Sequence, residues 1–163
     1  MSSLSENPCH RLTLAPVPLS NPEAQALIGL LDAELTERYP NPADNHFELT
    51  AEQVSGEHGV FLVARIGDQA VGCGALRSLD DVTGEIKRMY VTPSARRSGV
   101  ARCLLAELER HAHRLGLRRL VLETGAAQPE SIGLYQRAGF GRIPRFGEYA
   151  DSPASVCMAK TLR

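Results

Sequence analysis

The residues with the clearest capacity for chemistry lie between positions 85 and 101, where the chain reads EIKRMYVTPSARRSGVA. A strand-like run ends at Val91, a Thr-Pro pair interrupts it, and residues 96–101 open a long amphipathic helix. The first backbone N–H groups of a helix have no intrahelical partner, and here Arg96 and Arg97 flank them. A helix start of this kind suits a pyrophosphate, so the sequence predicts a nucleotide-like ligand.

Two well-known phosphate-binding motifs do not describe this loop. The Walker sequence G-x-x-x-x-G-K-[ST] is absent from the chain, and a dinucleotide-binding fingerprint needs more glycines than residues 96–101 offer. Small residues at a helix start can also serve to allow close packing. The loop alone therefore leaves a structural and a functional interpretation open.

The hydrophobic pattern predicts the elements that position this loop. Residues 60–66 and 69–76 form a hairpin, and residues 85–91 follow as the third strand of a meander. Gly72 and Gly74 inside the second strand predict a bulge or a close backbone neighbour. Helices are expected over residues 22–38, 98–115 and 128–138, with a short one after Thr50, and further strands over 10–17, 118–123, 140–143 and 156–161. Strands in a meander followed by strand–helix–strand units indicate a mixed sheet of the α+β or α/β kind.

Length and composition indicate an ordinary globular protein. We expect residues 1–9 to be loosely ordered and residues 10–163 to form a single domain. A formal charge of −1 gives no overall attraction to nucleic acid or to an anionic membrane, so any anion site must be local. The N-terminal residues lack the features of a signal peptide, and the apolar runs are too short to span a membrane. A cytoplasmic location is therefore expected.

The four cysteines, Cys9, Cys73, Cys103 and Cys157, are scattered along the chain without a C-x-x-C pair. Disulfide frameworks are typical of shorter secreted chains, so we expect reduced thiols. Cysteine and histidine do not cluster at ligand spacing, so no metal site is expected. Cys103 lies within the long helix and is interpreted as a core residue.

The loop and a second motif further along the chain together resemble the motifs of a known protein family. The run Val91-x-Pro-x-x-Arg96-Arg97-Ser-Gly-Val-Ala101 resembles the acetyl-CoA loop of the GNAT superfamily of acyltransferases, R/Q-x-x-G-x-G/A. Residues 128–140, Gln-x-x-Ser-Ile-x-Leu-Tyr-x-x-x-Gly-Phe, resemble the second signature of that superfamily, N-x-x-A-x-x-L-Y-x-x-x-G-F. The two motifs have the expected separation, and the resemblance covers residues 60–140. Alanine at position 101 replaces a glycine, and glutamine at position 128 replaces an asparagine.

The resemblance implies a fold and a co-substrate. It implies a single-domain α+β fold, with a mixed, mostly antiparallel sheet of about six or seven strands and about four flanking helices. The strand over residues 85–91 would splay from its parallel neighbour at residues 120–123, and the pantetheine of acetyl-CoA would lie in the V-shaped gap. A backbone amide near Met89 would polarise the acetyl carbonyl. The implied cofactor-binding residues are Met89, Tyr90, Val91, Arg96, Arg97, Ser98, Gly99, Val100, Ala101 and Gln128.

Two side chains are expected to handle protons. Tyr135 matches the family's position for a hydrogen bond to the leaving thiolate. Because a thiol pKa near 8.5 lies below that of tyrosine, full proton transfer from Tyr135 is uphill by about 2 kcal/mol. An alkylammonium is only about 0.04% neutral at pH 7, so a base is also needed. Glu85 is the candidate, acting directly or through water, and Glu123 on the adjacent strand is the rival.

The resemblance therefore implies direct transfer of an acetyl group from acetyl-CoA to a primary amine, through a tetrahedral intermediate. No acetyl-enzyme is expected, because no cysteine falls in either motif. We expect a small-molecule acceptor rather than nucleic acid or a membrane, and the resemblance leaves room for a homodimer. A non-catalytic acyl-CoA-binding or regulatory module and a protein lysine or N-terminal acetyltransferase are the alternatives.

The residues that recognise the acceptor are the least readable part of the sequence. Arg77, Lys87 and Arg88 either bind a carboxylate or phosphate of the substrate or face solvent opposite acidic neighbours. Loop residues are expected to border the acceptor cleft, namely Tyr39, His46, Arg145, Glu148 and Tyr149. The amine itself stays open among amino acids, polyamines, small antibiotics and protein amines.

Overall fold

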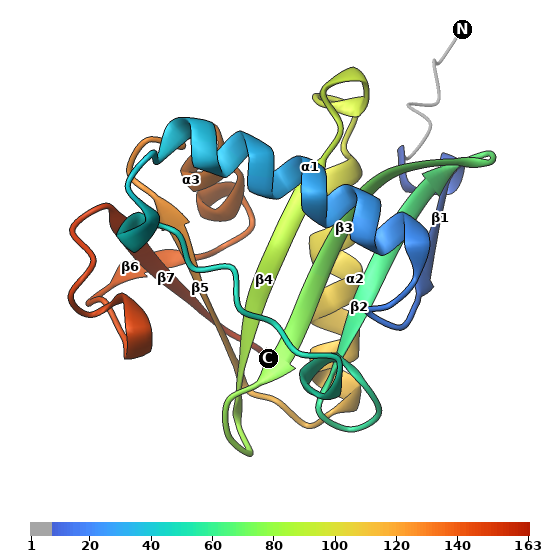
Figure 1. Ribbon diagram of the computed structural model, residues 1–163. Coiled ribbons are helices and arrows are strands. Elements are labelled where there is room, and N and C mark those ends of the chain that lie inside the picture. Colours follow the sequence, from blue (N-terminus) through green and yellow to red (C-terminus); the bar gives the residue numbers. More distant parts are fainter. Residues whose placement is uncertain (1–7) are drawn as a thin grey trace, which may run out of the picture.

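The computed structural model describes residues 8–163, which form one seven-stranded sheet with helices on both faces (Figure 1). The strand order is β1-β2-β3-β4-β5-β7-β6. The strands are β1 (Leu12–Pro16), β2 (Gly59–Ile66), β3 (Gln69–Ser78), β4 (Thr83–Val91), β5 (Arg119–Gly125), β6 (Gly141–Ile143) and β7 (Ser155–Thr161). The α-helices are α1 (Pro22–Arg38), α2 (Val100–Arg114) and α3 (Pro129–Arg137). Short 3-10 helices are η1 (Pro8–Arg11), η2 (Pro42–Asp44), η3 (Glu52–Val54), η4 (Pro93–Ala95) and η5 (Gly147–Tyr149).

The α+β fold with a mixed, mostly antiparallel sheet is confirmed. All strand pairs are antiparallel except β4 with β5, as the meander and the strand–helix–strand pattern predicted. The expected short helix after Thr50 is the 3-10 helix η3, so the described residues hold three α-helices rather than about four. Residues 8 and 9 belong to η1, and the remainder of the segment expected to be loosely ordered lies outside the described residues. No helix within residues 8–163 has the length and apolar character to cross a membrane.

The two faces of the sheet carry separate hydrophobic clusters (Figure 1). Helix α1 covers one face, where Ala24, Leu27 and Leu31 pack against strands β2 to β4. Helix α2 covers the other face, where Leu104 and Leu108 are fully buried. These faces are called the α1 face and the α2 face below.

A β-bulge interrupts the pairing of β3 with β4. Cys73 pairs with Tyr90 and Ala75 pairs with Lys87, so two β4 residues oppose the single Gly74. Arg88, one of the two, has a φ of 58° in the left-handed region. The bulge predicted at the glycines of β3 is confirmed, and a Cβ on Gly72 would lie 2.9 Å from the backbone oxygen of Tyr90, the predicted close backbone neighbour. A Cβ on Gly74 would lie 2.5 Å from the side-chain sulfur of Met89. The bulge lets consecutive residues of β4 share a face, which a regular strand forbids.

The expected splay lies between β4 and β5. The two strands pair in parallel from Thr83–Arg119 to Ile86–Leu122, and the pairing then stops. Strand β4 continues to Val91 without β5, whereas β5 stays paired with β7 as far as Gly125. The sheet therefore opens between the ends of two neighbouring parallel strands.

Candidate active site

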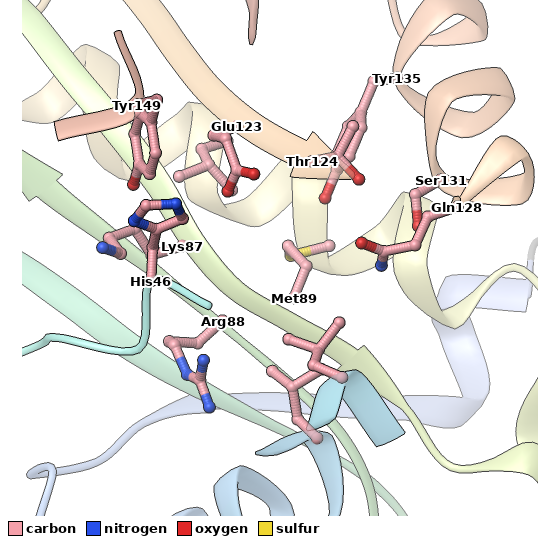
Figure 2. Close-up of a pocket in the computed structure, with 13 residues that line it drawn as sticks. His46, Lys87, Arg88, Met89, Glu123, Thr124, Gln128, Ser131, Tyr135 and Tyr149 are labelled. Atoms are coloured by element: carbon pink, nitrogen blue, oxygen red, sulfur yellow. The ribbon is translucent and has the colours of Figure 1, made fainter. Parts of the chain in front are cut away.

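A pocket occupies the splay between β4 and β5 (Figure 2). Strands β4 and β5 supply its walls, and α1, α3, the segment after α1 and η5 close around it. Its lining residues are Leu31, Leu35, His46, Ile86, Lys87, Arg88, Met89, Glu123, Thr124, Gln128, Ser131, Tyr135 and Tyr149. Strands, helices and loops distant in sequence thus converge on one site.

The pocket connects the two faces of the sheet. Glu85 pairs directly with Val121, so these side chains share a face, and Lys87 and Glu123 lie two residues further along the same face. Because Lys87 also pairs with Ala75 of the α1-side cluster, this is the α1 face. Tyr135 and Met89 pack with the α2-side cluster instead. Glu123 and Tyr135 therefore approach the splay from opposite faces.

Glu123 is the acidic side chain that lines this pocket. Burial raises its pKa from 4.5 to about 7, while a hydrogen bond from Ser155 and the charge of Lys87 act in the opposite direction. A carboxyl that titrates near neutral pH can accept and release a proton under working conditions. The geometry thus brings Glu123, the rival base, to the place where an acceptor amine would enter.

Glu85 lies one step behind the pocket and does not line it. Its side chain is 1% exposed, and both carboxylate oxygens are engaged. Oε1 accepts hydrogen bonds from Arg77, with Nε at 2.8 Å and Nη2 at 2.7 Å, and Oε2 accepts one from the Tyr149 hydroxyl at 2.6 Å. Tyr149 itself lines the pocket, so Glu85 reaches the site through the tyrosine that it holds.

Tyr135 projects from α3 into the pocket, as Figure 2 shows. The residue is 6% exposed, and its ring packs edge-on against Phe140 with centroids 5.9 Å apart. Burial raises the pKa of the Tyr135 hydroxyl, and the charge of Glu123 raises it further. The hydroxyl is therefore protonated at neutral pH and can donate a hydrogen bond at the splay.

Helix α2 begins at the loop with backbone N–H groups that have no intrahelical partner. Gly99 is the N-cap residue with a φ of 87°, and it lacks the side chain that would cap the helix. The Ser98 hydroxyl donates to the carbonyl of Ala95 instead. Arg97 also adopts a positive φ, 64°, which costs a non-glycine residue on the order of 1 kcal/mol and is typical of ligand-binding loops. Ala101 lies in the first turn of α2, where a helical φ makes glycine unnecessary.

Arg96 ties this loop to the end of β4 and to α1. Its Nε donates to the carbonyl of Val91 at 2.9 Å, its Nη2 pairs with Glu34 at 2.6 Å, and its guanidinium lies 5.7 Å from the ring centre of Tyr90. The Tyr90 ring belongs to the α1-side cluster, so this residue offers its backbone rather than its side chain to the splay. Nearby, Thr92 Oγ1 is buried without a hydrogen-bond partner among the described residues. Free amides, an arginine-rich loop and an orphaned hydroxyl fit a phosphate-bearing ligand such as acetyl-CoA.

Gln128 shapes the turn between β5 and α3. Its Oε1 accepts hydrogen bonds from the N–H of Gly125 at 3.1 Å and from the Tyr39 hydroxyl at 3.3 Å. The same hydroxyl accepts from the N–H of Ala127 at 3.1 Å. A Cβ on Gly125 would lie 1.6 Å from the Tyr39 oxygen, so this tight arrangement requires glycine.

The other expected acceptor residues divide between the pocket and its surroundings. His46 and Tyr149 line the pocket, with their rings edge-on at 4.9 Å, and Glu148 pairs with Lys87. Arg145 donates to the carbonyl of Ser152. Five lining residues were not singled out as site residues from the sequence, namely Leu31, Leu35, Ile86, Thr124 and Ser131. The helical spacing of the two leucines predicts that they face the core. This spacing does not indicate that they also line a pocket.

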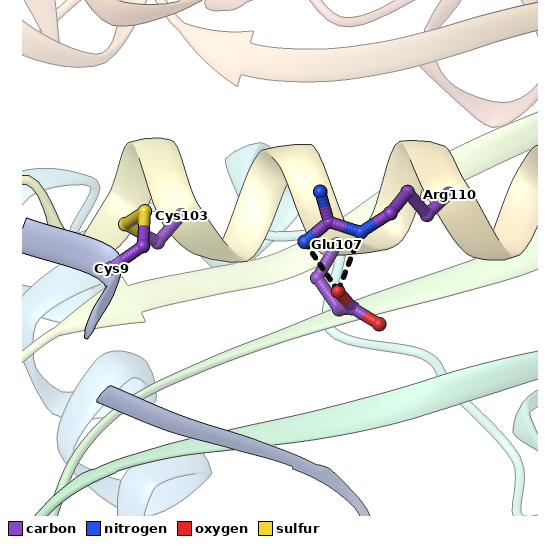
Figure 3. The surroundings of a disulfide bond; sticks show 4 residues. All are labelled: Cys9, Cys103, Glu107 and Arg110. Atoms are coloured by element: carbon purple, nitrogen blue, oxygen red, sulfur yellow. Dashed lines mark hydrogen bonds and ion pairs between the residues drawn. A yellow bond between two sulfur atoms is a disulfide. The ribbon is translucent and has the colours of Figure 1, made fainter. Parts of the chain in front are cut away.

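The expectation of four reduced cysteines is wrong for two of them. Cys9 of η1 and Cys103 of α2 form a disulfide across 94 positions of sequence (Figure 3). Cys103 is buried as expected, at 1% exposed, while Cys73 and Cys157 are free and buried. The backbone N–H of Cys103 donates to Gly99, so the disulfide anchors the first turn of the helix that begins at the loop. Sequence spacing gave no sign of this pairing, because the fold alone brings η1 to α2.

Comparisons with known proteins agree with this geometry. The model of the acetyltransferase (GNAT) family matches residues 24–140. An IAA acetyltransferase of Azospirillum brasilense is 39% identical over 137 residues, which cover 83% of this chain and 88% of that protein. A solved structure from Klebsiella pneumoniae, assigned as an acyl-CoA N-acyltransferase, is 33% identical with a TM-score of 0.79, covering 93% of this chain and 98% of its own. A GNAT acetyltransferase of Elizabethkingia anophelis with acetyl-CoA bound shares the fold at 21% identity, with a TM-score of 0.67 over 93% of this chain and 99% of that one. Because the family model covers most of the chain and the first relative spans nearly all of its own length, the protein belongs to the GNAT family of acetyltransferases.

Proposed function

We propose that this acetyltransferase transfers the acetyl group of acetyl-CoA directly to the primary amine of a small molecule. In this proposal Glu123 accepts the proton of the amine and Tyr135 donates a hydrogen bond to the leaving thiolate. The observation that carries the proposal is the pocket in the splay, where these two side chains meet from opposite faces of the sheet. Acetyl-CoA supplies the thioester carbonyl and the thiolate leaving group.

The raised pKa of Glu123 suits it to deprotonate an amine. An alkylammonium has a pKa near 10.4, so proton transfer to an ordinary glutamate is strongly uphill. A pKa of about 7 instead of 4.5 narrows this gap and lowers the cost of the transfer by about 3 kcal/mol. Glu85, the first candidate from the sequence, already binds Arg77 and Tyr149 and acts in this proposal through the position of Tyr149.

In this proposal the co-substrate occupies the opposite side of the pocket. Beyond Ile86, strand β4 has no β5 partner, so the backbone of Met89 and Val91 is placed to pair with an extended pantetheine. A backbone amide near Met89 and Tyr90 would polarise the carbonyl. The amides of residues 97–101 would hold the pyrophosphate, with Arg97 exposed beside them.

Two observations support a small acceptor. The acceptor side of the pocket is small and is bordered by Leu31 and Leu35 of α1, His46 and Tyr149. One relative is named for the acetylation of IAA. The cytoplasmic location and the homodimer stay predictions. The Cys9–Cys103 disulfide weighs against the cytoplasmic location, because disulfides are rare in cytosolic proteins.

The test measures the release of CoA thiol from acetyl-CoA with a broad panel of primary amines, with mass spectrometry of the products. Tyr135→Phe is expected to slow release with the best acceptor about tenfold or more, while acetyl-CoA affinity measured by calorimetry changes little. Glu123→Gln is expected to slow it further near pH 7. Glu109→Gln is the matched control, since Glu109 pairs with Lys160 and does not line the pocket. Binding of acetyl-CoA without release of thiol for any amine would favour a non-catalytic module instead.

A further inference from the structure

Lys87 is a buried cation with more hydrogen-bonding capacity than its neighbours use. Its side chain is 5% exposed and lines the pocket on the α1 face. An ammonium group carries three N–H donors. Within residues 8–163, Nζ makes one hydrogen bond, to Glu148 Oε1 at 3.4 Å, and lies 5.9 Å from the ring centre of Tyr149. A buried charge with a single long contact is costly unless a ligand adds partners.

The two neighbouring cations are already occupied. Arg88 forms an ion pair with Asp32 of α1 and stacks 5.0 Å from the ring centre of Phe47. Arg77 donates two hydrogen bonds to Glu85. Lys87 is therefore the pocket cation best able to bind an additional anion.

Lys87 and Glu123 occupy corresponding positions on the two splayed strands. The last paired positions of the splayed strands are Ile86 and Leu122, so Lys87 and Glu123 are the next residues on either side of the gap. They share the α1 face, and neighbouring strands lie about 5 Å apart where their pairing ends. The charge of Lys87 acts on the Glu123 carboxyl. A cation and a proton-accepting carboxylate thus follow the last paired positions of the two splayed strands on the same face of the sheet, and both line the pocket (Figure 2).

We propose that Lys87 binds a carboxylate of the acceptor, so that the substrates are amino acids or similar amino-carboxylates. The inference rests on the proposed function: the ammonium of the substrate lies at Glu123, which takes its proton, and the carboxylate lies at Lys87. The substrate carboxylate supplies Lys87 with the hydrogen bonds that Glu148 leaves open. The adjacent opposite charges match a molecule that carries both charges a few atoms apart.

The side chain of such a substrate would meet an apolar wall. Leu31 and Leu35 of α1 line the pocket on the α1 face. We therefore expect leucine, methionine and phenylalanine to be better acceptors than aspartate or glutamate, whose second carboxylate would face this wall and Glu148.

The test compares each amino acid with its amide, which keeps the amine and the side chain but lacks the carboxylate. With leucine and leucinamide as the first pair, kcat/KM is expected to favour the acid about tenfold to a hundredfold, as for a hydrogen-bonded charge. Lys87→Met should lower this ratio to near one, mainly through a higher KM for leucine, and Lys87→Arg should restore part of it. Lys160→Met is a matched control, because Lys160 is the other lysine of the chain and pairs with Glu109 away from the pocket.

The outcomes separate this inference from the proposed function. Equal or better use of the amides by the native protein, or a ratio that Lys87→Met leaves unchanged, would overturn the carboxylate site while the acetyltransferase activity stands. If no amine releases CoA, the proposed function fails, and calorimetric binding of leucine and leucinamide to the CoA-saturated protein decides the carboxylate site. Tighter binding of leucine that is lost in Lys87→Met supports the site, and equal binding overturns it. Near-native melting of Lys87→Met shows that the variant is folded.

Discussion

Replacing Glu123 by glutamine is expected to stabilise the protein above neutral pH while it slows acetyl transfer. The carboxyl has a pKa of about 7 in the folded chain because of burial, against 4.5 when exposed. The folded state therefore holds this proton more tightly than the unfolded state does. The resulting stability is fully present below pH 4.5 and is lost as the pH rises through 7.

The size of the effect follows from these two pKa values. Over the full range, a difference of about 2.5 units corresponds to a loss of about 3 kcal/mol of unfolding free energy. Between pH 5 and pH 8 the same linkage gives a loss of about 2 to 3 kcal/mol. Glutamine keeps the shape and the ability to bind Ser155 but does not titrate, so the variant escapes this loss.

The assay is urea denaturation of the native protein and of Glu123→Gln at pH 5, 6, 7 and 8, without substrates. Other titrating groups affect both proteins alike, so the difference between the two unfolding free energies isolates position 123. The unfolding free energy of the variant, relative to that of the native protein, should rise by about 2 to 3 kcal/mol between pH 5 and pH 8. A difference that is flat with pH would refute the claim that Glu123 is a buried carboxyl of raised pKa, and with it the main argument for this base.

Three further predictions follow from the contacts. In pH profiles of kcat/KM, Glu85→Gln should keep the rise in activity near pH 7 that reports titration of the base, and Glu123→Gln should abolish this rise. The reverse pattern would make Glu85 the base. Cys9→Ser should lower the unfolding free energy by about 2 to 4 kcal/mol, because the disulfide closes a loop across 94 positions. Dithiothreitol should lower the stability of the native protein but not of this variant, and equal sensitivity would argue against the disulfide. Gly125→Ala should lower the unfolding free energy by about 1 to 3 kcal/mol, because the added Cβ would overlap the Tyr39 oxygen. Gly133→Ala is the control: its Cβ would meet only the end of a flexible arginine, so thermal melts should show little change.

The order and type of the elements could be predicted from the sequence because their signals are local. Alternating apolar residues indicate the strands. Asn followed by Pro is typical of a helix start, and the Asn21 side chain accepts a hydrogen bond from the N–H of Ala24 at 3.0 Å at the start of α1. The loop before α2 was equally local, since the Thr-Pro pair and Gly99 mark it directly. Each of these features depends on residues within a few positions of one another.

The choice of the pocket carboxylate could not be made in the same way. Glu85 and Glu123 lie on neighbouring strands and share one face, so the period of two assigns both to the same side of the sheet. What separates them is Tyr149, which is 64 positions from Glu85 and binds its carboxylate. Likewise Tyr39 reaches Gln128 across 89 positions. Contacts of this range depend on the packing of loops, for which the chain carries no periodic signal.

The bulge explains how one strand serves both halves of the site. In a regular strand Arg88 would point to the α2 face, where its charge would lie among Leu104, Leu108 and other apolar side chains without a partner. The extra residue instead places Arg88 beside Lys87 on the α1 face, where Asp32 pairs with it, and returns Met89 to the α2 face. Gly74 permits this, because its missing side chain leaves room for the Met89 sulfur. The positive charges thus gather on the face of the sheet that carries Glu123, and the backbone of β4 that follows has no β5 partner along the splay.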